Sequence, residues 1–85
     1  MKIEYHRKFI KTFAKLPLKI KYKFYERLKM FGQDRSTNIL NNHSVGHIYP
    51  GWWSINITGD IRALYEEISP DSMIFMKIGT HSELY

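Results

Sequence analysis

Five side chains in the second half of this 85-residue sequence suit acid–base or phosphate chemistry: His43, His47, Asp60, Arg62 and His81. Histidine suits proton transfer because its unperturbed pKa lies close to neutral pH. Arginine suits phosphate because its planar guanidinium stays charged and binds two oxygens at once. RNA can be cut without a metal by such groups. A base activates the 2′-hydroxyl, an acid protonates the 5′-leaving oxygen, and a cation stabilises the charged phosphorane.

The surroundings of three of these residues can be predicted from the strand alternation and the turn residues next to them. His81 follows a Gly-Thr pair after the last predicted strand, so we expect its ring at a sheet edge or in a loop, open to solvent. Arg62 alternates with Ile61 and Ala63, so it points to the open face of the sheet if those two point into the core. Asp60 lies in the preceding turn, where it orients a histidine, acts as a base, or only forms a local hydrogen bond.

The two remaining histidines of this half have different expectations. His43 is a candidate second acid–base group, and the alternative interpretation is a polar loop residue. His47 is expected to be peripheral. The histidines are not spaced like a metal cluster, so we expect neither a metal nor another cofactor.

Hydrophobic periodicity predicts a strand and two helices in the first half of the chain. Residues 2–5 alternate polar and apolar side chains, as in a short strand. Apolar residues then recur at helical spacing in two segments on either side of Pro17, which ends the first helix and suits the first turn of the second. The second segment ends at Gly32, the usual place for a helix C-cap, and the short link makes the two helices a hairpin.

The second half of the chain predicts an antiparallel sheet. Residues 34–42 are polar and are expected to form a loop, with one turn around Ile39 and Leu40. Three alternating segments separated by turn sequences follow, at residues 53–57, 61–68 and 73–78. We therefore predict a single α+β domain over residues 1–85, in which a short N-terminal strand precedes a two-helix hairpin packed on an antiparallel β-meander.

Charge is distributed unevenly along the chain. Residues 1–30 carry ten basic and two acidic side chains (net +8), whereas residues 31–85 carry three basic and six acidic ones (net −3). A basic half suits an anionic partner such as nucleic acid, an acidic protein or a membrane surface, although lysines also serve simply to solubilise helices. The absence of cysteine excludes disulfides and thiolate metal sites. No segment has the apolar length of a membrane span or a signal core, so we expect a cytoplasmic location and no membrane partner.

Three segments resemble a known family of proteins. Residues 51–65 resemble the sheet of toxins of the RelE/ParE superfamily, and residues 78–85, Ile-Gly-Thr-His-Ser-Glu-Leu-Tyr, resemble its YafQ-like branch. Residues 42–46 are similar to the His-Pro-Leu-x-Gly element of that branch. The predicted order of strand, two helices and meander also agrees with the family, so the resemblance covers essentially the whole chain.

The resemblance implies a toxin of a type II toxin–antitoxin system that pairs with a cognate antitoxin protein. Many toxins of the RelE and YafQ types are endoribonucleases (mRNA interferases) that cut mRNA, generally in the decoding site of the ribosome, and we expect this activity here. The catalytic candidates are His81, Arg62, Asp60 and His43. ParE-type relatives share the fold but act on DNA gyrase, so gyrase inhibition is one alternative. A catalytically weak relative that serves as an antitoxin-binding module is another.

With this resemblance the basic helical hairpin has two interpretations. It can bind the phosphates of mRNA and ribosomal RNA, because each contact releases counterions, or it can receive an acidic antitoxin that folds on binding. The candidates for RNA and ribosome binding are Lys8, Lys11, Lys15, Lys19, Lys23, Arg27 and Trp53. Trp53, like Trp52 and Tyr49, has a ring that can stack on bases.

The chain departs from the family pattern at three positions. The family often has an arginine near Trp53, a proline where this chain has Ser44, and, in some YafQ-like toxins, a histidine where we align Asn56. The lost arginine and histidine predict weaker phosphate binding or proton transfer, or a different substrate.

Overall fold

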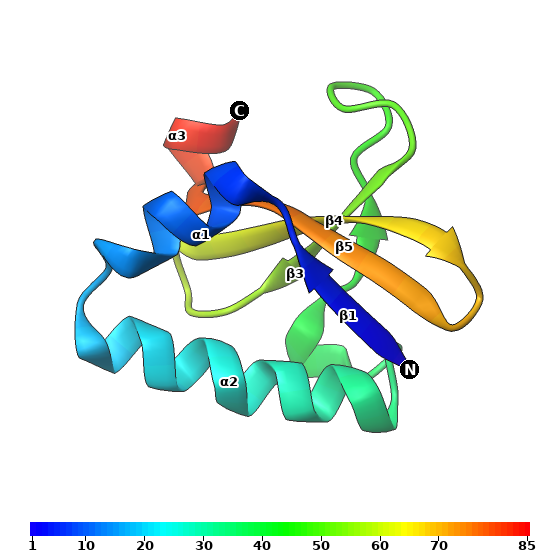
Figure 1. Ribbon diagram of the computed structural model, residues 1–85, viewed down its shortest axis with the longest axis horizontal. Helices are drawn as coiled ribbons and strands as arrows, with labels where there is room; N and C mark the ends of the chain where they lie inside the picture. Colours follow the sequence, from blue (N-terminus) through cyan, green and yellow to red (C-terminus); the bar gives the residue numbers. More distant parts are fainter.

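The computed structural model describes the whole chain, residues 1–85, and its elements follow the predicted order (Figure 1). They are β1 (Lys2–Tyr5), α1 (Arg7–Ala14), α2 (Leu18–Gln33), the 3₁₀ turn η1 (Asn38–Leu40), β2 (His43–Ser44), β3 (Trp52–Asn56), β4 (Ile61–Ser69), β5 (Ser72–Thr80) and α3 (His81–Leu84). The predicted α+β class is confirmed. None of the helices combines the length and the apolar composition that a membrane crossing requires.

The five strands form one mixed sheet in the order β1-β5-β4-β3-β2. Strands β3, β4 and β5 make the predicted antiparallel meander. Strand β1 pairs with β5 in parallel, with Tyr5 opposite Phe75, so the strongly apolar β5 has a neighbour on each side. Since strands paired in parallel cannot be joined by a tight turn, the chain leaves β1 through the helical hairpin and returns to the sheet at β2.

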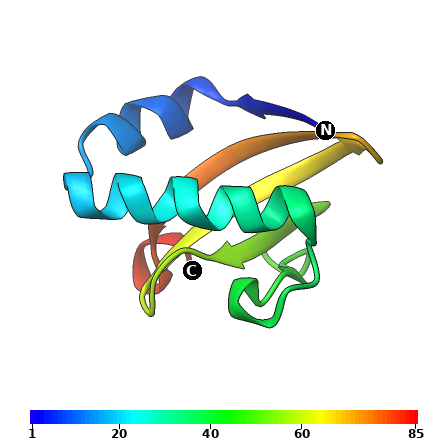
Figure 2. The same ribbon diagram turned by 90° about the horizontal axis from the view of Figure 1, so that it is seen from below.

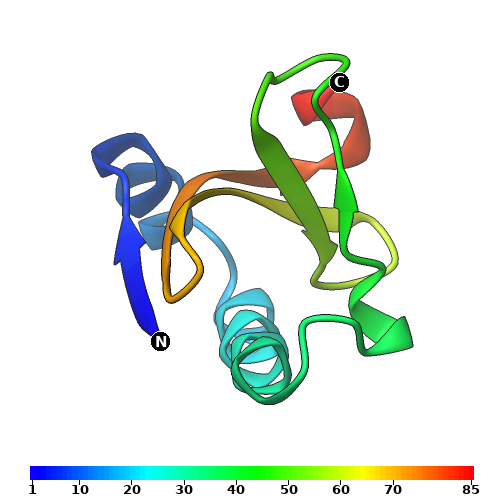
Figure 3. The ribbon, with the colours of Figure 1, turned by 90° about the vertical axis from the view of Figure 1, so that its right-hand side faces the viewer.

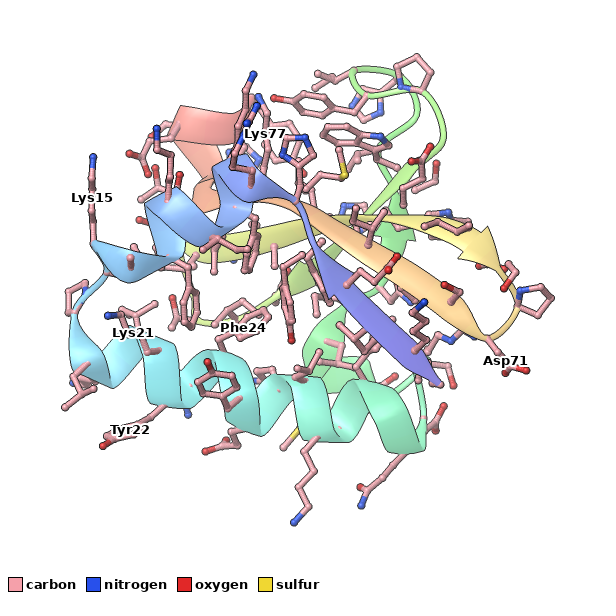
Figure 4. The ribbon with its side chains drawn as sticks, in the orientation of Figure 1. Lys15, Lys21, Tyr22, Phe24, Asp71 and Lys77 are labelled. Atoms are coloured by element: carbon pink, nitrogen blue, oxygen red, sulfur yellow. The ribbon has the colours of Figure 1, made fainter.

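The hairpin of α1 and α2 packs on one face of the sheet (Figure 2). The main core of 11 buried residues lies between them. Its aromatic members are Phe9, Phe24, Phe31, Tyr65 and Phe75. Phe24 points from α2 toward the sheet, whereas Lys15 and Tyr22 point away from it (Figure 4). The hairpin thus has an apolar inner side and a basic outer side, as its sequence pattern predicts.

A smaller cluster lies on the other face of the sheet. Val45, Leu64 and Leu84 are buried there, and Tyr49 and Trp52 pack against them. Figures 1 and 3 show α3 and the loop between β2 and β3 on the side of the sheet opposite α2. The alternation along β4 predicts an open face at Leu64. The structure corrects this expectation, because α3 and the loop bring apolar side chains that cover part of the face.

Two local predictions were wrong, and one short strand was not predicted. Helix α2 continues through Gly32 to Gln33, and its C-cap is Asp34 with an extended φ of −159°, so no left-handed glycine is needed to end it. His43 and Ser44, which directly follow the predicted loop, pair with β3 as strand β2. His81 lies in neither a sheet edge nor a loop, because it is the first residue of the one-turn helix α3.

Candidate active site

A hollow of about 270 Å³ gathers most of the residues that the sequence nominated for chemistry. It is lined by His43, Val45, His47, Ile48, Arg62, His81 and Tyr85. Strand β2 supplies His43, β4 supplies Arg62 and α3 supplies His81. No acidic side chain lines the hollow. Its walls therefore combine a guanidinium with three imidazoles, and this combination attracts anions.

His81 is held by its backbone while its ring stays free of hydrogen bonds within the protein. Its N–H donates to the carbonyl oxygen of Asp60 at 3.1 Å, which ties α3 to the turn between β3 and β4. The imidazole packs against the ring of Tyr85 with 4.7 Å between centroids. The side chain is exposed and lines the hollow, so a ligand there can reach the ring.

Arg62 points to the open face, as predicted, and carries a charge that no carboxylate neutralises. Its Nη1 donates to the carbonyl oxygens of Thr58 at 2.9 Å and Ile61 at 3.2 Å. Its Nη2 donates to the carbonyl oxygen of Gly59 at 3.1 Å. The arginine takes part in none of the four ion pairs of the chain. These neutral acceptors fix the guanidinium in place without cancelling its charge, which suits a phosphate-binding group.

His43 is oriented by a backbone carbonyl. Its Nδ1 lies 2.7 Å from the carbonyl oxygen of Asn41. A carbonyl only accepts, so Nδ1 carries the hydrogen and Nε2 of the neutral ring keeps a free lone pair. Asn41 itself adopts a left-handed conformation with φ 46°, which asparagine tolerates better than most residues. The local backbone therefore sets His43 as a proton acceptor.

The structure separates the two remaining candidates of this half. His47 lines the hollow, so it lies nearer to the other histidines than the sequence predicts. The reason is tertiary: Tyr49 stacks on Trp52, with 4.9 Å between ring centroids, and the loop that holds His47 folds over the sheet. Asp60 does not line the hollow, and its contribution is the carbonyl oxygen that accepts from His81. The local hydrogen bonds of its turn are made instead by the hydroxyl of Thr58.

The basic candidates of the hairpin lie outside the histidine hollow. Lys11, Lys15 and Lys19 are exposed on α1 and around the start of α2. Lys8 lines a second hollow beside α3, together with Lys77 and Glu83 of the C-terminal segment. The hairpin thus presents its charge over a broad surface that reaches the neighbourhood of α3 on one side.

Lys23 and Arg27 border the same turn as Arg62, but from the α2 side. They line a hollow with Asn56, Thr58 and Gly59. Arg27 donates through Nε to the carbonyl oxygen of Ile57 at 3.3 Å. Both basic residues also contact one carboxylate oxygen of Glu26, at 3.5 and 3.3 Å, which offsets part of their charge.

The three departures from the family pattern lie around the site rather than in it. Trp53 is 38% exposed, does not line the histidine hollow, and by strand alternation shares the core-side face of Ile55. Asn56 pairs with Arg62 in the sheet, and its Oδ1 is buried without a hydrogen-bond partner. Ser44 is exposed, and its hydroxyl accepts from the N–H of Gly46 at 3.2 Å.

The capping box at Thr80 is a feature of the site that the sequence-based predictions do not include, although its residues are present in the sequence. Thr80 and Glu83 have the spacing in which each side chain binds the backbone N–H of the other residue, which marks a helix start. Across the whole chain, no group of three or more His, Asp or Glu side chains is arranged to hold a metal ion.

The fold is that of known toxins. No family model and no curated protein sequence matches the chain. Among solved structures it is similar to YafQ from E. coli strain BL21(DE3), with 19% identity over 98% of this chain and 96% of that one and a TM-score of 0.78. It is also similar to a YoeB/ParE toxin from Agrobacterium tumefaciens, with 14% identity over 95% and 99% of the two chains and a TM-score of 0.77.

A third solved structure is the intact E. coli RelBE toxin–antitoxin complex. The chain matches it with 15% identity over 93% of its own length and 94% of that chain, at a TM-score of 0.71. The chain therefore has the fold of RelE/ParE-type toxins, over nearly its full length. The predicted resemblance is confirmed at the level of the fold, which the YafQ, YoeB/ParE and RelE structures share.

Proposed function

We propose that this chain is the toxin of a type II toxin–antitoxin pair and a metal-independent endoribonuclease that cleaves mRNA on the ribosome. The observation that carries the proposal is the hollow in which His43, Arg62 and His81 meet from three separate elements. These are the groups that cleavage by the RNA's own 2′-hydroxyl requires: two proton-transfer groups and one cation.

The orientation of His43 suggests how the roles divide. Nε2 of His43 removes the proton of the 2′-hydroxyl, because its Nδ1 is engaged with Asn41. The 2′-oxygen attacks the adjacent phosphorus and the bond from phosphorus to the 5′-oxygen breaks, leaving a 2′,3′-cyclic phosphate. Protonated His81 donates its proton to the leaving 5′-oxygen. Arg62 stabilises the negative charge of the phosphorane, and Asp60 supports His81 through its carbonyl oxygen.

The test compares His81→Ala and His81→Gln with the wild type after induction in cells without antitoxin. We expect both variants to lose growth arrest and cleavage, by about 100- to 10,000-fold for a proton-transfer group. Primer extension on the transcripts should show cuts in frame with codons for the wild type only. Lys29→Gln, which removes an exposed cation of α2, is the matched control and should keep the full pattern. A folded His81→Ala protein that cleaves like the wild type would sink the proposal.

Gyrase inhibition is the second candidate, since one of the similar structures is described as a YoeB/ParE toxin. An inhibitor of this kind needs no acid–base pair. It predicts that the His81→Ala variant still arrests growth and that the purified protein stops DNA supercoiling in vitro. A wild-type chain that neither arrests growth nor cuts RNA would point instead to a binding module that has lost its activity.

The proposed antitoxin partner has a surface that fits it at the helical hairpin. A groove of about 180 Å³ between β1, α1 and α2 is lined only by Tyr5, Phe9, Ile10, Phe13, Phe24 and Tyr25. Leu18 and Tyr22 are further apolar side chains of α2, and they are 61% and 65% exposed. Lys21 reaches from α2 toward α1, where its Nζ donates to the carbonyl oxygen of Ala14. An amphipathic antitoxin segment with acidic residues beside an apolar face matches this surface.

The basic side chains that the antitoxin leaves free would bind ribosomal RNA in the decoding site. Lys8, Lys11 and Lys15 on α1 and Lys19 and Lys23 of α2 are suited to this role, with Arg27 and Trp53 at the margins of the site. Binding of this kind weakens steeply with salt, because each phosphate contact releases counterions. The proposal places the reaction in the cytoplasm, where ribosomes and mRNA are.

A further inference from the structure

Helix α3 cannot fold on its own. It is one turn of four residues, His81–Leu84, and so short a helix does not offset the cost of its nucleation in water. Its geometry must therefore be imposed by contacts with the rest of the chain. Since α3 carries His81, those contacts also decide where the imidazole lies.

The strongest of these contacts is the capping box at the start of α3. The backbone N–H of Glu83 donates to the hydroxyl oxygen of Thr80 at 3.2 Å. In return, the backbone N–H of Thr80 donates to Oε1 of Glu83 at 2.7 Å. The hydrogen bond from the Thr80 backbone, followed by the one with its side chain, lowers the pKa of the Glu83 carboxyl. The ionised carboxylate is thus the form that holds the turn together.

Three more contacts hold the helix in place. The N–H of His81 donates to the carbonyl oxygen of Asp60, and the hydroxyl of Tyr49 donates to the carbonyl oxygen of Leu84. The side chain of Leu84 is buried in the small cluster against the sheet. None of these contacts uses the imidazole of His81. The ring therefore stays available to a substrate, while these contacts fix the backbone of α3.

Gly79 provides the space that the Glu83 carboxylate occupies. A Cβ at residue 79 would lie 3.1 Å from Oε1 of Glu83 and 3.6 Å from its Cβ. Gly79 is also the sheet partner of Arg62. Any side chain at this position would push on the carboxylate, at the point where the arginine strand and the histidine helix meet.

We propose that Glu83 is a positioning residue, which with Thr80 and the space at Gly79 fixes α3 so that His81 faces Arg62 and His43 across the hollow. The proposal rests on the proposed function and deepens it. Glu83 does not touch the reacting atoms, since it lines the hollow of Lys8 and Lys77 and not the one that holds the histidines. Its effect on the reaction passes through the position of His81 alone.

The experiment measures kcat and KM for cleavage of mRNA on programmed ribosomes by Glu83→Ala and Glu83→Gln. We expect Glu83→Ala to lower kcat by about 10- to 100-fold, as a misplaced catalytic group does, with KM within about twofold of the wild type because the RNA contacts remain. Glu83→Gln keeps an acceptor oxygen and should restore kcat to within about fivefold of the wild type. Asp71→Asn is the control acid, because Asp71 lies at the far turn between β4 and β5 (Figure 4).

Amide hydrogen exchange separates positioning from loss of the fold. In Glu83→Ala the N–H of His81 should exchange faster, because its bond to Asp60 loosens, whereas the N–H of Phe75 in the core should exchange as in the wild type. If Glu83→Ala does not fold, the pair Thr80→Ala and Thr80→Ser serves the same purpose. Only serine keeps the hydroxyl, so only Thr80→Ser should retain kcat.

The outcomes distinguish this inference from the function on which it rests. Wild-type kcat in Glu83→Ala, with His81→Ala inactive, overturns the positioning role and leaves the nuclease intact. Equal loss of kcat in Glu83→Ala and Glu83→Gln also overturns it, because the acceptor oxygen would then not be what matters. Full activity of His81→Ala overturns the proposed function itself.

Discussion

The two faces of the sheet differ in how they are built and in what they can do. The hairpin face holds a continuous core in which aromatic rings contact one another, such as Phe24 and Phe75 with 5.5 Å between centroids. The opposite face has a cluster of three buried residues, and beside it the hollow with three histidines. One face accounts for most of the stability, while the other places polar groups where a ligand can reach them.

The difference teaches that stability and chemistry can be changed separately in this small fold. On the hairpin face, side chains are fixed by close packing, which resists any change of volume. On the site face, His43, Arg62 and the N–H of His81 are fixed by hydrogen bonds to backbone carbonyls. Substitutions there remove charge or a proton acceptor without opening a cavity. Substitutions on each face, compared with one another, can test this separation.

The largest effect is expected from a substitution on the site face. His43→Gln removes the proposed base, so kcat for RNA cleavage should fall by about 100- to 10,000-fold. The free energy of unfolding should change little, because the side chain is exposed. Single-turnover cleavage and a urea titration measure the two quantities. A loss of stability that explains the loss of activity would contradict the separation of the two faces.

The opposite pattern is expected for Phe75→Ala on the hairpin face. Phe75 is fully buried and contacts several aromatic rings, so its truncation should lower the free energy of unfolding by about 3–5 kcal/mol. The activity per folded molecule should stay near that of the wild type. Denaturant titration gives the stability, and cleavage at low temperature, where the variant is folded, gives the activity. A Phe75→Ala variant that is stable but inactive would show that packing on the hairpin face also affects the active site.

An intermediate effect is expected at the outer side of the hairpin. Tyr22 is 65% exposed and supports no core contact, so Tyr22→Ala should weaken binding of an acidic, amphipathic antitoxin segment by about tenfold or more. RNA cleavage by the free toxin should not change. Titration calorimetry with the cognate antitoxin gives the affinity. Unchanged affinity for Tyr22→Ala and for Leu18→Ala would exclude this surface as the antitoxin site.

A smaller, pH-dependent effect follows from the lowered pKa of Glu83. A carboxyl with a depressed pKa in the folded state adds stability above its ordinary value of 4.5, and this contribution is lost as the pH falls through the folded value. Acidification below pH 4.5 should therefore loosen α3 before the core unfolds. Exchange of the backbone amide hydrogen of His81, followed over this pH range, measures the loosening of α3. The same profile in Glu83→Gln, which does not titrate, would refute the assignment to Glu83.

The smallest effect is expected from His47→Gln. His47 lines the hollow but is exposed and makes no hydrogen bond within the protein, so its removal should raise KM by about two- to threefold, the size expected of one exposed polar contact. The rate constant kcat should be unaffected, because His47 has no role in the proposed proton transfers. Steady-state kinetics at low and moderate salt would show whether the effect is screened. A large loss of kcat would make His47 a catalytic residue.

Much of the fold could be predicted from the sequence because its signals are local. The alternation at Lys2–Tyr5, the break at Pro17 and the turn sequences of the meander all reflect the conformations of neighbouring residues. The end of α2 was misplaced because Gly32 is a permissive residue and not an obligatory stop. The start of α3 was missed even though its capping-box spacing is present, since a four-residue helix has too little periodicity to be noticed.

The sequence predicted the chemical groups of the candidate site better than it predicted which residues line the site. Residue types and the family resemblance nominated His43, Arg62 and His81, and the structure brings these three together. His47 was expected to be peripheral because it has no clear counterpart in the family pattern, and nothing in its neighbours shows that the loop folds back over the sheet. Asp60 was nominated for its carboxylate, but the structure connects it to His81 through its backbone.

By itself, the sequence determined the main helices and strands, their order, the basic hairpin and the presence of two proton-transfer groups with an arginine, because these depend on residue types and short spacings. Only the tertiary structure decided which of these groups share a hollow, that β1 lies beside β5, and that Glu83 holds the helix of His81. The physical reason is that pairing and packing between distant segments depend on the register of the whole sheet. No single segment carries that register.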